Sequence, residues 1–246
     1  MKYNHSVITP DELLERVLYR DAMLLVIDKP SGIAVHQGPG GGPNLESMFG
    51  ALTYGLPRPP ALVHRLDRDT SGCLVLGRHR KALRKGGDLF SGGRAEKTYW
   101  AICRGAPPQD EGVIDAPLVK KNDRVNGWEM MVQEGGQVAV TGYKVLSRGP
   151  NASLVAFYPK TGRTHQIRIH ASHIGCPLLG DPRYGDLTEE ERAQPFCLHA
   201  KKIVLPFYPK KDPITVEAPL PPIWARQAQK MHLVLPDAAA TMAAEA

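Results

Sequence analysis

The sequence predicts an α+β fold with a mixed, largely antiparallel sheet flanked by helices and loops. Strand-like apolar runs outnumber helical patterns, and the two do not alternate regularly, which disfavours a doubly wound parallel sheet. No internal repeat is present. A chain of 246 residues can form one large domain or two small ones. We expect a single domain over residues 1–236 and a disordered, alanine-rich tail over residues 237–246.

The first elements are expected near the N-terminus. Thr9 and Glu12 form a capping-box pattern around a proline, which predicts the start of a short helix. Residues 24–27 form an apolar run typical of a strand. The glycine- and proline-rich stretch 38–43 is expected to be a flexible loop, after which Asn44 can cap a second short helix.

The rest of the chain is mostly strand-like. A short apolar run leads into the polar turn 64–72, and a second apolar run follows at 73–76, so the turn should lie at an exposed end of a sheet. Between Thr164 and Gly175 the apolar spacing becomes helical, with Thr164 as the expected cap. Further strands are expected at residues 98–103, 138–146, 153–158 and 201–207.

Composition limits the compartment and the partners. No apolar run is long enough to span a membrane, and residues 1–14 lack the apolar core of a signal peptide. The four cysteines contain no CxxC pair, so a reducing cytoplasm is the simplest compartment. The net charge of +6 and the pI near 9.1 have the right sign for a polyphosphate partner but do not establish one.

The densest polar cluster is the turn 64–72, in which His64, Arg65 and Arg68 surround Asp67 and Asp69. Nearby positive charge keeps a carboxylate ionised and therefore available as a nucleophile or a base. The alternative is an ordinary polar turn whose aspartates cap backbone amides.

A second cluster covers residues 161–170. Arg168 can give a buried carboxylate a bidentate partner, and Arg163 can contact a phosphate, although a solvated helix face would explain the same pattern. The spacing of His165, His170 and His173 does not match a helical metal site, so no metal is expected.

Two further features have more than one interpretation. Tyr99 opens a strand and can stack on a base or exchange a proton with it, or it can be an ordinary aromatic of a sheet face. The glycine-rich stretch 38–42 lacks the Gly-Lys-Ser/Thr ending of a phosphate-binding loop, so no nucleotide cofactor is expected.

Taken together and in order, the clusters closely resemble the RluA-type pseudouridine synthases, which isomerise uridine in ribosomal or transfer RNA. The resemblance covers residues 20 to 220. It is carried by Ile27-Asp28-Lys29-Pro30-Ser31-Gly32 with His36, His64-Arg65-Leu66-Asp67 with Thr70-Ser71-Gly72, Lys97-Thr98-Tyr99, the stretch Gly162 to His170, Gly180-Asp181, and Leu198-His199-Ala200.

The resemblance implies roles for particular residues. Asp67 would be the catalytic aspartate and Arg168 its partner, Arg65 would help to extrude the uridine, and Tyr99 would pack on the uracil and take its C5 proton. The remaining expected substrate contacts are His64, Arg163, Thr164 and Leu198.

The resemblance also implies the fold and the partners. It implies a pseudouridine synthase fold with a catalytic cleft across the sheet and a reaction without a cofactor. We expect a cytoplasmic monomer that acts on rRNA or tRNA and has no membrane partner. A flipped uracil needs a cationic insertion, an aromatic platform and a reactive group in one cleft, which agrees with these residue types.

The sequence departs from the family pattern in two places. Too few residues precede the matching region for the N-terminal S4 RNA-binding domain of many members, so the catalytic domain itself should grip RNA. The stretch 79–94 contains two Gly-Gly pairs, so its helix is expected to be broken or short. Its cations, among them Lys81 and Arg84, are expected to touch RNA phosphates.

Two other interpretations compete. Residues 67–70 mimic the DxDxT motif of aspartate-nucleophile phosphohydrolases, but His64 and Arg65 interrupt the strand that should precede it, and further acidic ligands for magnesium are missing. A catalytically silent RNA-binding module would explain the charge but not a carboxylate surrounded by cations.

Overall fold

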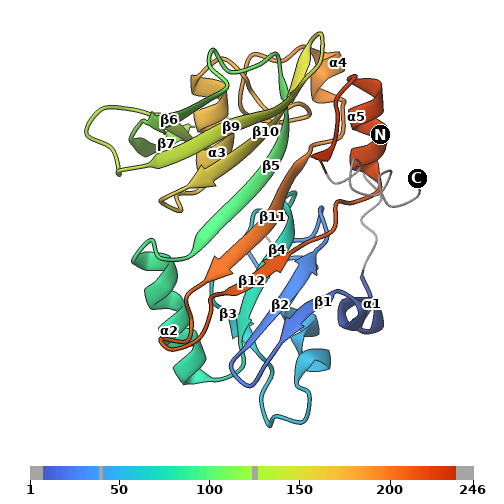
Figure 1. The fold of residues 1–246 in the computed structure, drawn as a ribbon, viewed down its shortest axis with the longest axis vertical. Helices are drawn as coiled ribbons and strands as arrows, with labels where there is room; N and C mark the ends of the chain where they lie inside the picture. The colour runs from blue at the N-terminus through green and yellow to red at the C-terminus, as the bar shows by residue number, and fades with distance from the viewer. Residues whose placement is uncertain (1–7, 39–40, 124–126, 237–246) are drawn as a thin grey trace. The chain divides into compact units, whose positions relative to one another are not determined.

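The computed structural model describes residues 8–38, 41–123 and 127–236, so the expected tail over 237–246 lies outside the described residues (Figure 1). The chain divides into two compact units. Unit 1 comprises Met1–Lys97 and His199–Pro219, and unit 2 comprises Thr98–Leu198 and Leu220–Ala246. Both units are built around strands with helices beside them (Figure 1).

Unit 1 begins with the expected capped helix. In α1 (Pro10–Glu15) the Thr9 hydroxyl accepts from the Glu12 amide and the Glu12 carboxylate accepts from the Thr9 amide, which confirms the predicted capping box. The chain then turns directly into a strand at Val17. Asn44 accepts a hydrogen bond from the Ser47 amide at the start of the short 3₁₀ helix η1 (Glu46–Leu52).

The strands of unit 1 form a mixed arrangement. In order, β1 (Val17–Arg20), β2 (Leu24–Lys29) and β4 (Ser71–Gly77) are antiparallel neighbours, and β3 (Ala61–Leu62) also pairs with β4. The residues of β11 (Leu198–Leu205) that belong to unit 1 run parallel to β4, with His199 opposite Ser71. The strand β12 (Ile214–Glu217) closes this part of the sheet antiparallel to β11.

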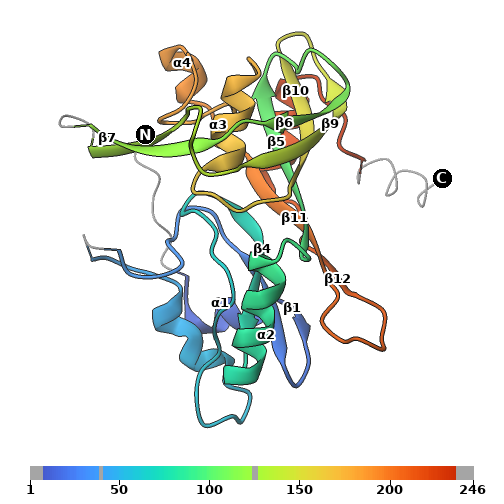
Figure 2. The ribbon, with the colours of Figure 1, turned by 90° about the vertical axis from the view of Figure 1, so that its left-hand side faces the viewer.

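The helix α2 (Arg80–Ser91) is continuous, so the expectation of a broken or short helix is wrong. It lies along β4 with Ala82, Gly86 and Leu89 buried (Figure 2). Gly86 is required by packing rather than by flexibility, because a Cβ there would lie 2.6 Å from Cγ1 of Val63. Gly86 lets α2 pack closely against Val63, and this packing offsets the low helix propensity of glycine.

Unit 2 contains an antiparallel sheet. Its strands lie in the order β5 (Glu96–Arg104), β10 (Ala152–Pro159), β9 (Val140–Arg148) and β6 (Glu111–Asp115). A separate antiparallel hairpin is formed by β7 (Leu118–Asp123) and β8 (Gly127–Val132). The predicted α+β class, with its mixed and largely antiparallel sheet, is confirmed.

Helices cover both faces of the unit 2 sheet. Ala101 and Cys103 of β5 pack with Ile167 of α3 (Gln166–His173), whereas the alternate residues Trp100 and Ile102 pack with Trp224 of α5 (Ile223–Lys230). Because alternate residues of a strand point to opposite faces, α3 and α5 lie on opposite sides of β5. The short helix α4 (Glu189–Arg192) also belongs to this unit.

The start of α3 differs from the expectation. Its N-cap residue is His165, in a left-handed conformation with φ 55°, and no side chain caps the helix. Thr164 therefore does not have the predicted capping role. Within residues 8–38, 41–123 and 127–236, no helix is both long and apolar enough to cross a membrane.

Candidate active site

The turn that carries Asp67 connects β3 to β4 in unit 1. Leu66 is buried and anchors the turn, Arg65 and Arg68 are exposed on either side, and Asp67 itself is half-buried. The turn closes with a hydrogen bond from the Thr70 amide to the Asp67 carbonyl, 3.2 Å long. Asp67 is thus held on a short, anchored turn, on which the Arg68 guanidinium pairs with Asp69 at 3.2 Å.

Lys29 supports this turn from inside unit 1. Its side chain is fully buried, and Nζ donates to the carbonyl oxygens of Arg68 (2.9 Å), Thr70 (2.9 Å) and Pro30 (2.8 Å). Burial lowers the pKa of Lys29 to about 7, against the opposing pull of the Asp69 and Asp67 carboxylates. The sequence analysis names Lys29 only as part of a motif. In the structure, Lys29 fixes the backbone on both sides of Asp69.

The end of the turn is fixed by its contact with β11. Gly72 has φ 102°, and a Cβ there would lie 2.4 Å from the carbonyl oxygen of Ala200. The Ser71 hydroxyl is hydrogen bonded to Nδ1 of His199 at 2.8 Å, and both residues are buried. The Ser-Gly pair therefore allows β4 and β11 to approach closely where the turn enters the sheet.

His64 packs within unit 1. Its ring stacks on Phe90 with centroids 4.3 Å apart, and Nε2 accepts a hydrogen bond from the Val75 amide at 3.0 Å. Burial and the nearby Lys97 ammonium lower the pKa of His64 to about 3, so the imidazole is neutral. Its expected substrate contact stays a prediction, and the structure adds a role in attaching the turn to β4 and α2.

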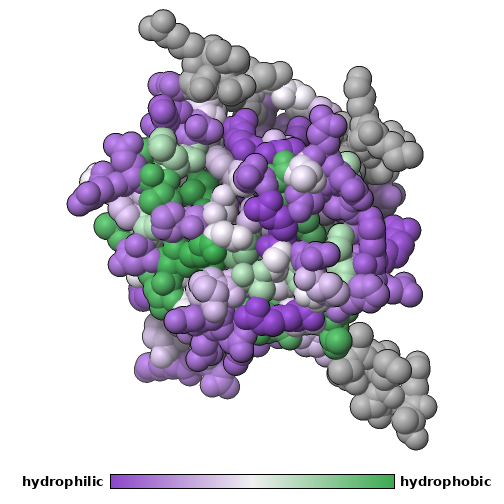
Figure 3. Space-filling view, turned by 90° about the horizontal axis from the view of Figure 1, so that it is seen from above, coloured by the Kyte–Doolittle hydropathy of each residue, from purple (hydrophilic) through white to green (hydrophobic). Residues whose placement is uncertain are grey.

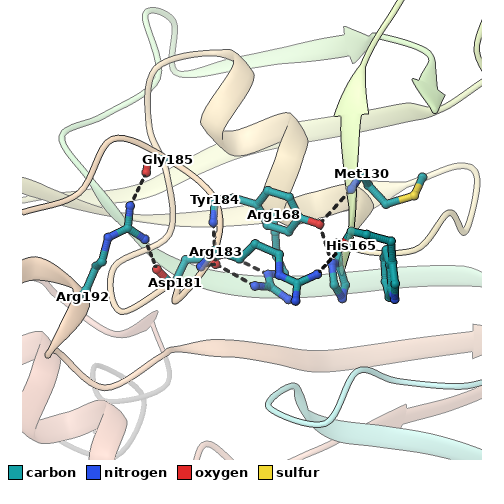
Figure 4. Close-up of polar contacts among 9 residues, drawn as sticks. Met130, His165, Arg168, Asp181, Arg183, Tyr184, Gly185 and Arg192 are labelled. Atoms are coloured by element: carbon teal, nitrogen blue, oxygen red, sulfur yellow. Dashed lines mark hydrogen bonds and ion pairs between the residues drawn. The ribbon is translucent and has the colours of Figure 1, made fainter. Parts of the chain in front are cut away.

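Arg168 of unit 2 forms a buried bidentate ion pair with Asp181 (Figure 4). Its Nε and Nη2 donate to the two carboxylate oxygens at 2.8 and 2.7 Å, and the two side chains are 8% and 1% exposed. Its guanidinium carbon also lies 4.9 Å from the ring centre of Tyr184 and 5.4 Å from that of Phe196. This packing fixes the orientation of the guanidinium plane.

Asp181 is itself held by its own loop. Its Oδ1 accepts from the amides of Arg183 and Tyr184, and its carbonyl accepts from Arg192, which also binds the Gly185 carbonyl (Figure 4). Sequence reasoning quoted Asp181 within a motif but gave it no role. Two features of the sequence could have indicated that Asp181 is the partner of Arg168. A buried arginine needs a buried carboxylate, and Asp181 follows a glycine in an otherwise apolar stretch.

Tyr99 lies on β5 opposite Phe157 of β10. It is half-buried and packs against an apolar cluster that contains Phe157, Ile167 and Leu198. The structure therefore brings two expected substrate contacts, Tyr99 and Leu198, to one cluster in unit 2. Tyr99 is at the rim of this cluster rather than inside it, so part of its side chain is accessible.

The turn before α3 is organised by Gln166. Its buried amide accepts from the Thr161 hydroxyl and the Arg163 amide, and donates to the Val140 carbonyl and the Thr141 hydroxyl. These bonds hold the segment that leads to Arg168. Both expected RNA contacts in this turn are exposed: Thr164, and Arg163, whose Nε donates to the Val138 carbonyl at 3.0 Å.

His170 of α3 and His165, the residue before the helix, have structural partners. Nδ1 of His170 is hydrogen bonded to the Thr141 hydroxyl (2.8 Å) and Nε2 to the Ala116 carbonyl (3.0 Å), and burial lowers the pKa of His170. Nδ1 of His165 is hydrogen bonded to the Tyr184 hydroxyl at 2.7 Å. In the part of the chain that the structure describes, no group of three or more metal-ligating side chains is found.

The expected site residues divide between the two units. Unit 1 carries His64, Arg65 and Asp67, and unit 2 carries Tyr99, Arg163, Thr164, Arg168 and Leu198. The pairing of Asp67 with Arg168 joins residues of different units and stays a prediction.

Comparison with known proteins identifies this combination. The sequence model of the RNA pseudouridylate synthase family matches residues 23–173, a range that contains Asp67, Tyr99 and Arg168. The chain belongs to this family. RNA pseudouridylate synthases isomerise uridine in RNA, so the expected RluA-type resemblance and enzyme class are confirmed, and the phosphohydrolase interpretation is excluded.

Relatives of this RNA pseudouridylate synthase match over most of their length. A protein of Zymomonas mobilis named as an RNA pseudouridine synthase is 45% identical, over 85% of this chain and 95% of that protein. The ribosomal large subunit pseudouridine synthase C of Vibrio vulnificus is 38% identical, over 85% of this chain and 67% of that protein. The solved structure of human RNA pseudouridylate synthase domain containing 4 is 29% identical to this chain, with a TM-score of 0.78. The match covers 92% of this chain and 97% of that structure's chain.

Proposed function

We propose that this pseudouridine synthase acts on ribosomal RNA of the large subunit, with Asp67 as its catalytic carboxylate. The observation that carries the assignment of Asp67 is its position on a turn that a fully buried lysine fixes through three carbonyl oxygens. Two bacterial relatives, from Vibrio vulnificus and Buchnera aphidicola, are named as ribosomal large subunit enzymes, which supports ribosomal rather than transfer RNA.

The reaction exchanges one glycosidic bond for another. The C1′–N1 bond breaks, the uracil turns, a C1′–C5 bond forms, and the proton on C5 is lost while N1 gains one. An ionised Asp67 can add to the ring, attack C1′ or remove a sugar proton, and each route needs a carboxylate rather than a carboxylic acid.

The other site residues support this chemistry. Arg65, exposed two residues before Asp67, can enter the space that a flipped uridine leaves. Tyr99 presents a ring for stacking on the uracil and a hydroxyl for the C5 proton. Arg168, oriented by Asp181, supplies a fixed cation for Asp67, and Arg163 and Thr164 contact the RNA backbone.

RNA is bound by cations of the enzyme itself. Arg80, Lys81 and Arg84 are exposed on one side of α2, opposite its buried residues. Such a row of cations suits contact with successive phosphates, which is the sequence-independent part of RNA affinity. The proposed assembly is a monomer without a cofactor.

We place the enzyme in the cytoplasm. The four cysteines are buried and unpaired, as is usual in a reducing compartment.

The test is to map pseudouridine in total RNA from cells with and without this protein. We expect one or a few positions of large-subunit ribosomal RNA to lose pseudouridine when the gene is deleted. Reintroduction of the wild-type protein should restore them, and reintroduction of Asp67→Ala should not. Purified protein should modify the same positions in the presence of EDTA.

Three outcomes would contradict the proposal. Lost positions confined to transfer RNA would overturn the choice of substrate. Full restoration by Asp67→Ala would overturn the assignment of the carboxylate. Activity that requires a divalent metal would overturn the cofactor-free reaction.

A further inference from the structure

An open hollow of about 390 Å³ lies in unit 2 beside the β7–β8 hairpin, and Thr164 is the one lining residue with a role proposed above. We call it the hairpin pocket. Its volume is within the range of small-molecule sites. The residues that line it are Leu118, Val119, Lys120, Met130, Gly135, Gly136, Gln137 and Thr164.

The walls of the hairpin pocket are preformed. The turn over residues 133–137 is attached to the start of β7 by backbone hydrogen bonds between Leu118 and Gln137 in both directions, 2.9 and 2.8 Å long, and by one from the Gln133 amide to the Pro117 carbonyl. Gly136 fits against this strand because a Cβ there would lie 2.8 Å from the Leu118 backbone. A ligand would therefore meet a shaped site rather than order a loose one.

The chemistry of the lining combines an apolar floor with a polar rim. Leu118 and Met130 are buried and belong to an apolar cluster with Tyr184. At the rim are the Lys120 ammonium, the Gln137 amide and the exposed Thr164 hydroxyl. A flat, partly apolar group with hydrogen-bonding edges and a negative charge, such as a nucleotide, is complementary to these groups.

A group of cations and aromatic rings continues from Lys120. Its Nζ lies 4.8 Å from the ring centre of Trp128, which is stacked on His165 at 5.5 Å. The guanidinium carbon of Arg183 lies 5.4 Å from the same ring, and its Nη1 donates to the Trp128 carbonyl. Cations beside aromatic side chains are characteristic of surfaces that bind unpaired RNA.

The charges near the pocket favour an anion. Lys120 and Arg163 are the cations at its rim and beside Thr164, and Arg183 lies beyond Trp128. Acidic residues adjoin the lining in sequence at Glu129, on the other face of β8 from Met130, and at Glu134 in the turn. Figure 3, seen from above, shows hydrophilic and hydrophobic residues interspersed on that face of the protein.

We propose that the hairpin pocket binds an unpaired nucleotide of the RNA substrate other than the uridine that is isomerised. This inference rests on the proposed function, because it requires an RNA substrate. Thr164 connects it to the proposed site, because the same turn that precedes Arg168 forms part of the rim. Binding a second nucleotide would select RNAs with an unpaired residue at a set distance from the target.

The test compares Lys120→Gln with Lys144→Gln, a matched loss of one exposed lysine from the same unit. Lys144 lies on β9, does not line the pocket, and makes a 4.0 Å contact with exposed Glu111. With the RNA fragment that carries the mapped uridine, we expect Lys120→Gln to raise KM about tenfold, as for one lost charged contact, with kcat unchanged. Lys120→Arg should retain most of the affinity, and Lys144→Gln should match the wild type.

Location is tested with the same RNA, substituted with 4-thiouridine and irradiated on the enzyme. Cross-links should map to the peptide containing Met130 or to residues 135–137, and should be lost in Lys120→Gln. Equal KM values for Lys120→Gln and Lys144→Gln, or cross-links only outside these peptides, would overturn the inference. Either result leaves the proposed function standing, since wild-type pseudouridine formation is measured separately.

Discussion

Asp181 determines how Arg168 is presented. The carboxylate is fully buried and receives two hydrogen bonds from Arg168 and two from backbone amides. It holds a guanidinium whose proposed role is to stabilise the catalytic carboxylate, and it acts through geometry.

Replacement of Asp181 should therefore lower both the stability of the protein and its catalytic rate. Asp181→Asn leaves a buried guanidinium without its counter-charge, so we expect the free energy of unfolding in urea to fall by about 3 kcal/mol. The rate of pseudouridine formation should fall more than tenfold even at a temperature where circular dichroism shows a folded protein. Asp186→Asn, in an exposed position of the same segment, is the control and should change neither quantity. A fully active Asp181→Asn enzyme would argue against the positioning role.

His64 should make stability sensitive to acid. Its pKa of about 3 in the folded protein is below the ordinary value of 6.5, so the unfolded chain binds a proton first as the pH falls. The contribution of the neutral imidazole is complete above pH 6.5 and is lost progressively between pH 6.5 and 3. Each pH unit in this window removes about 1 kcal/mol.

The measurement is the free energy of unfolding from urea titrations at pH 7, 6 and 5. His64→Gln can still accept the Val75 hydrogen bond but cannot be protonated. We expect this variant to lose less stability than the wild type between pH 7 and pH 5. Identical slopes for both proteins would show that the fold does not lower the pKa of His64.

At the level of single residues, prediction from sequence succeeded where the residues that act together are also close together in the chain. The polar turn around Asp67 was located because its charges lie within six positions. The partner of Arg168 was not found, because Asp181 lies on a separate loop thirteen residues further along and only the packed fold brings the two together. The function of Lys29 was hidden for the same reason, since its partners Arg68 and Thr70 are 39 and 41 residues away.

Among the elements, α2 shows that tertiary packing determines how replacement of a helical glycine changes stability. Gly86 faces Val63, whereas a Cβ on Gly87 would meet nothing within 4 Å. Gly86→Ala should destabilise the protein by about 1–3 kcal/mol through overpacking. Gly87→Ala should stabilise it by up to about 1 kcal/mol, because alanine is the better helix former. Thermal unfolding of the two variants measures this contrast, and equal shifts would contradict the packing argument.

The strands that sequence analysis missed are polar or interrupted. In β7 and β8 charged residues interrupt the apolar pattern, and β6 at the edge of its sheet buries only Ile114. An edge strand or a hairpin of this kind has a weak alternating pattern, because only part of one face is covered. The buried strands β2, β4, β5 and β10 have long apolar runs and were predicted correctly.

At the scale of the whole molecule, electrostatics should govern RNA affinity. Reversal of two exposed cations of α2, in Lys81→Glu/Arg84→Glu, should weaken binding and reduce the slope of log affinity against log salt by about 1 to 2. The control reverses two exposed cations of α5, in Arg226→Glu/Lys230→Glu. An unchanged salt slope in the α2 variant, or an equal change in both, would refute the assignment of α2 to the RNA-binding surface.

The central claim concerns a single carboxylate that acts without a cofactor. Asp67→Asn keeps the size and most hydrogen-bonding capacity of the side chain but removes its negative charge. The most direct measurement is single-turnover pseudouridine formation by this variant on ribosomal RNA, at enzyme concentrations that a parallel filter-binding titration shows to be saturating. We expect binding within a few-fold of the wild type and no detectable product. Product formed by fully bound Asp67→Asn at a rate close to that of the wild type would contradict the account.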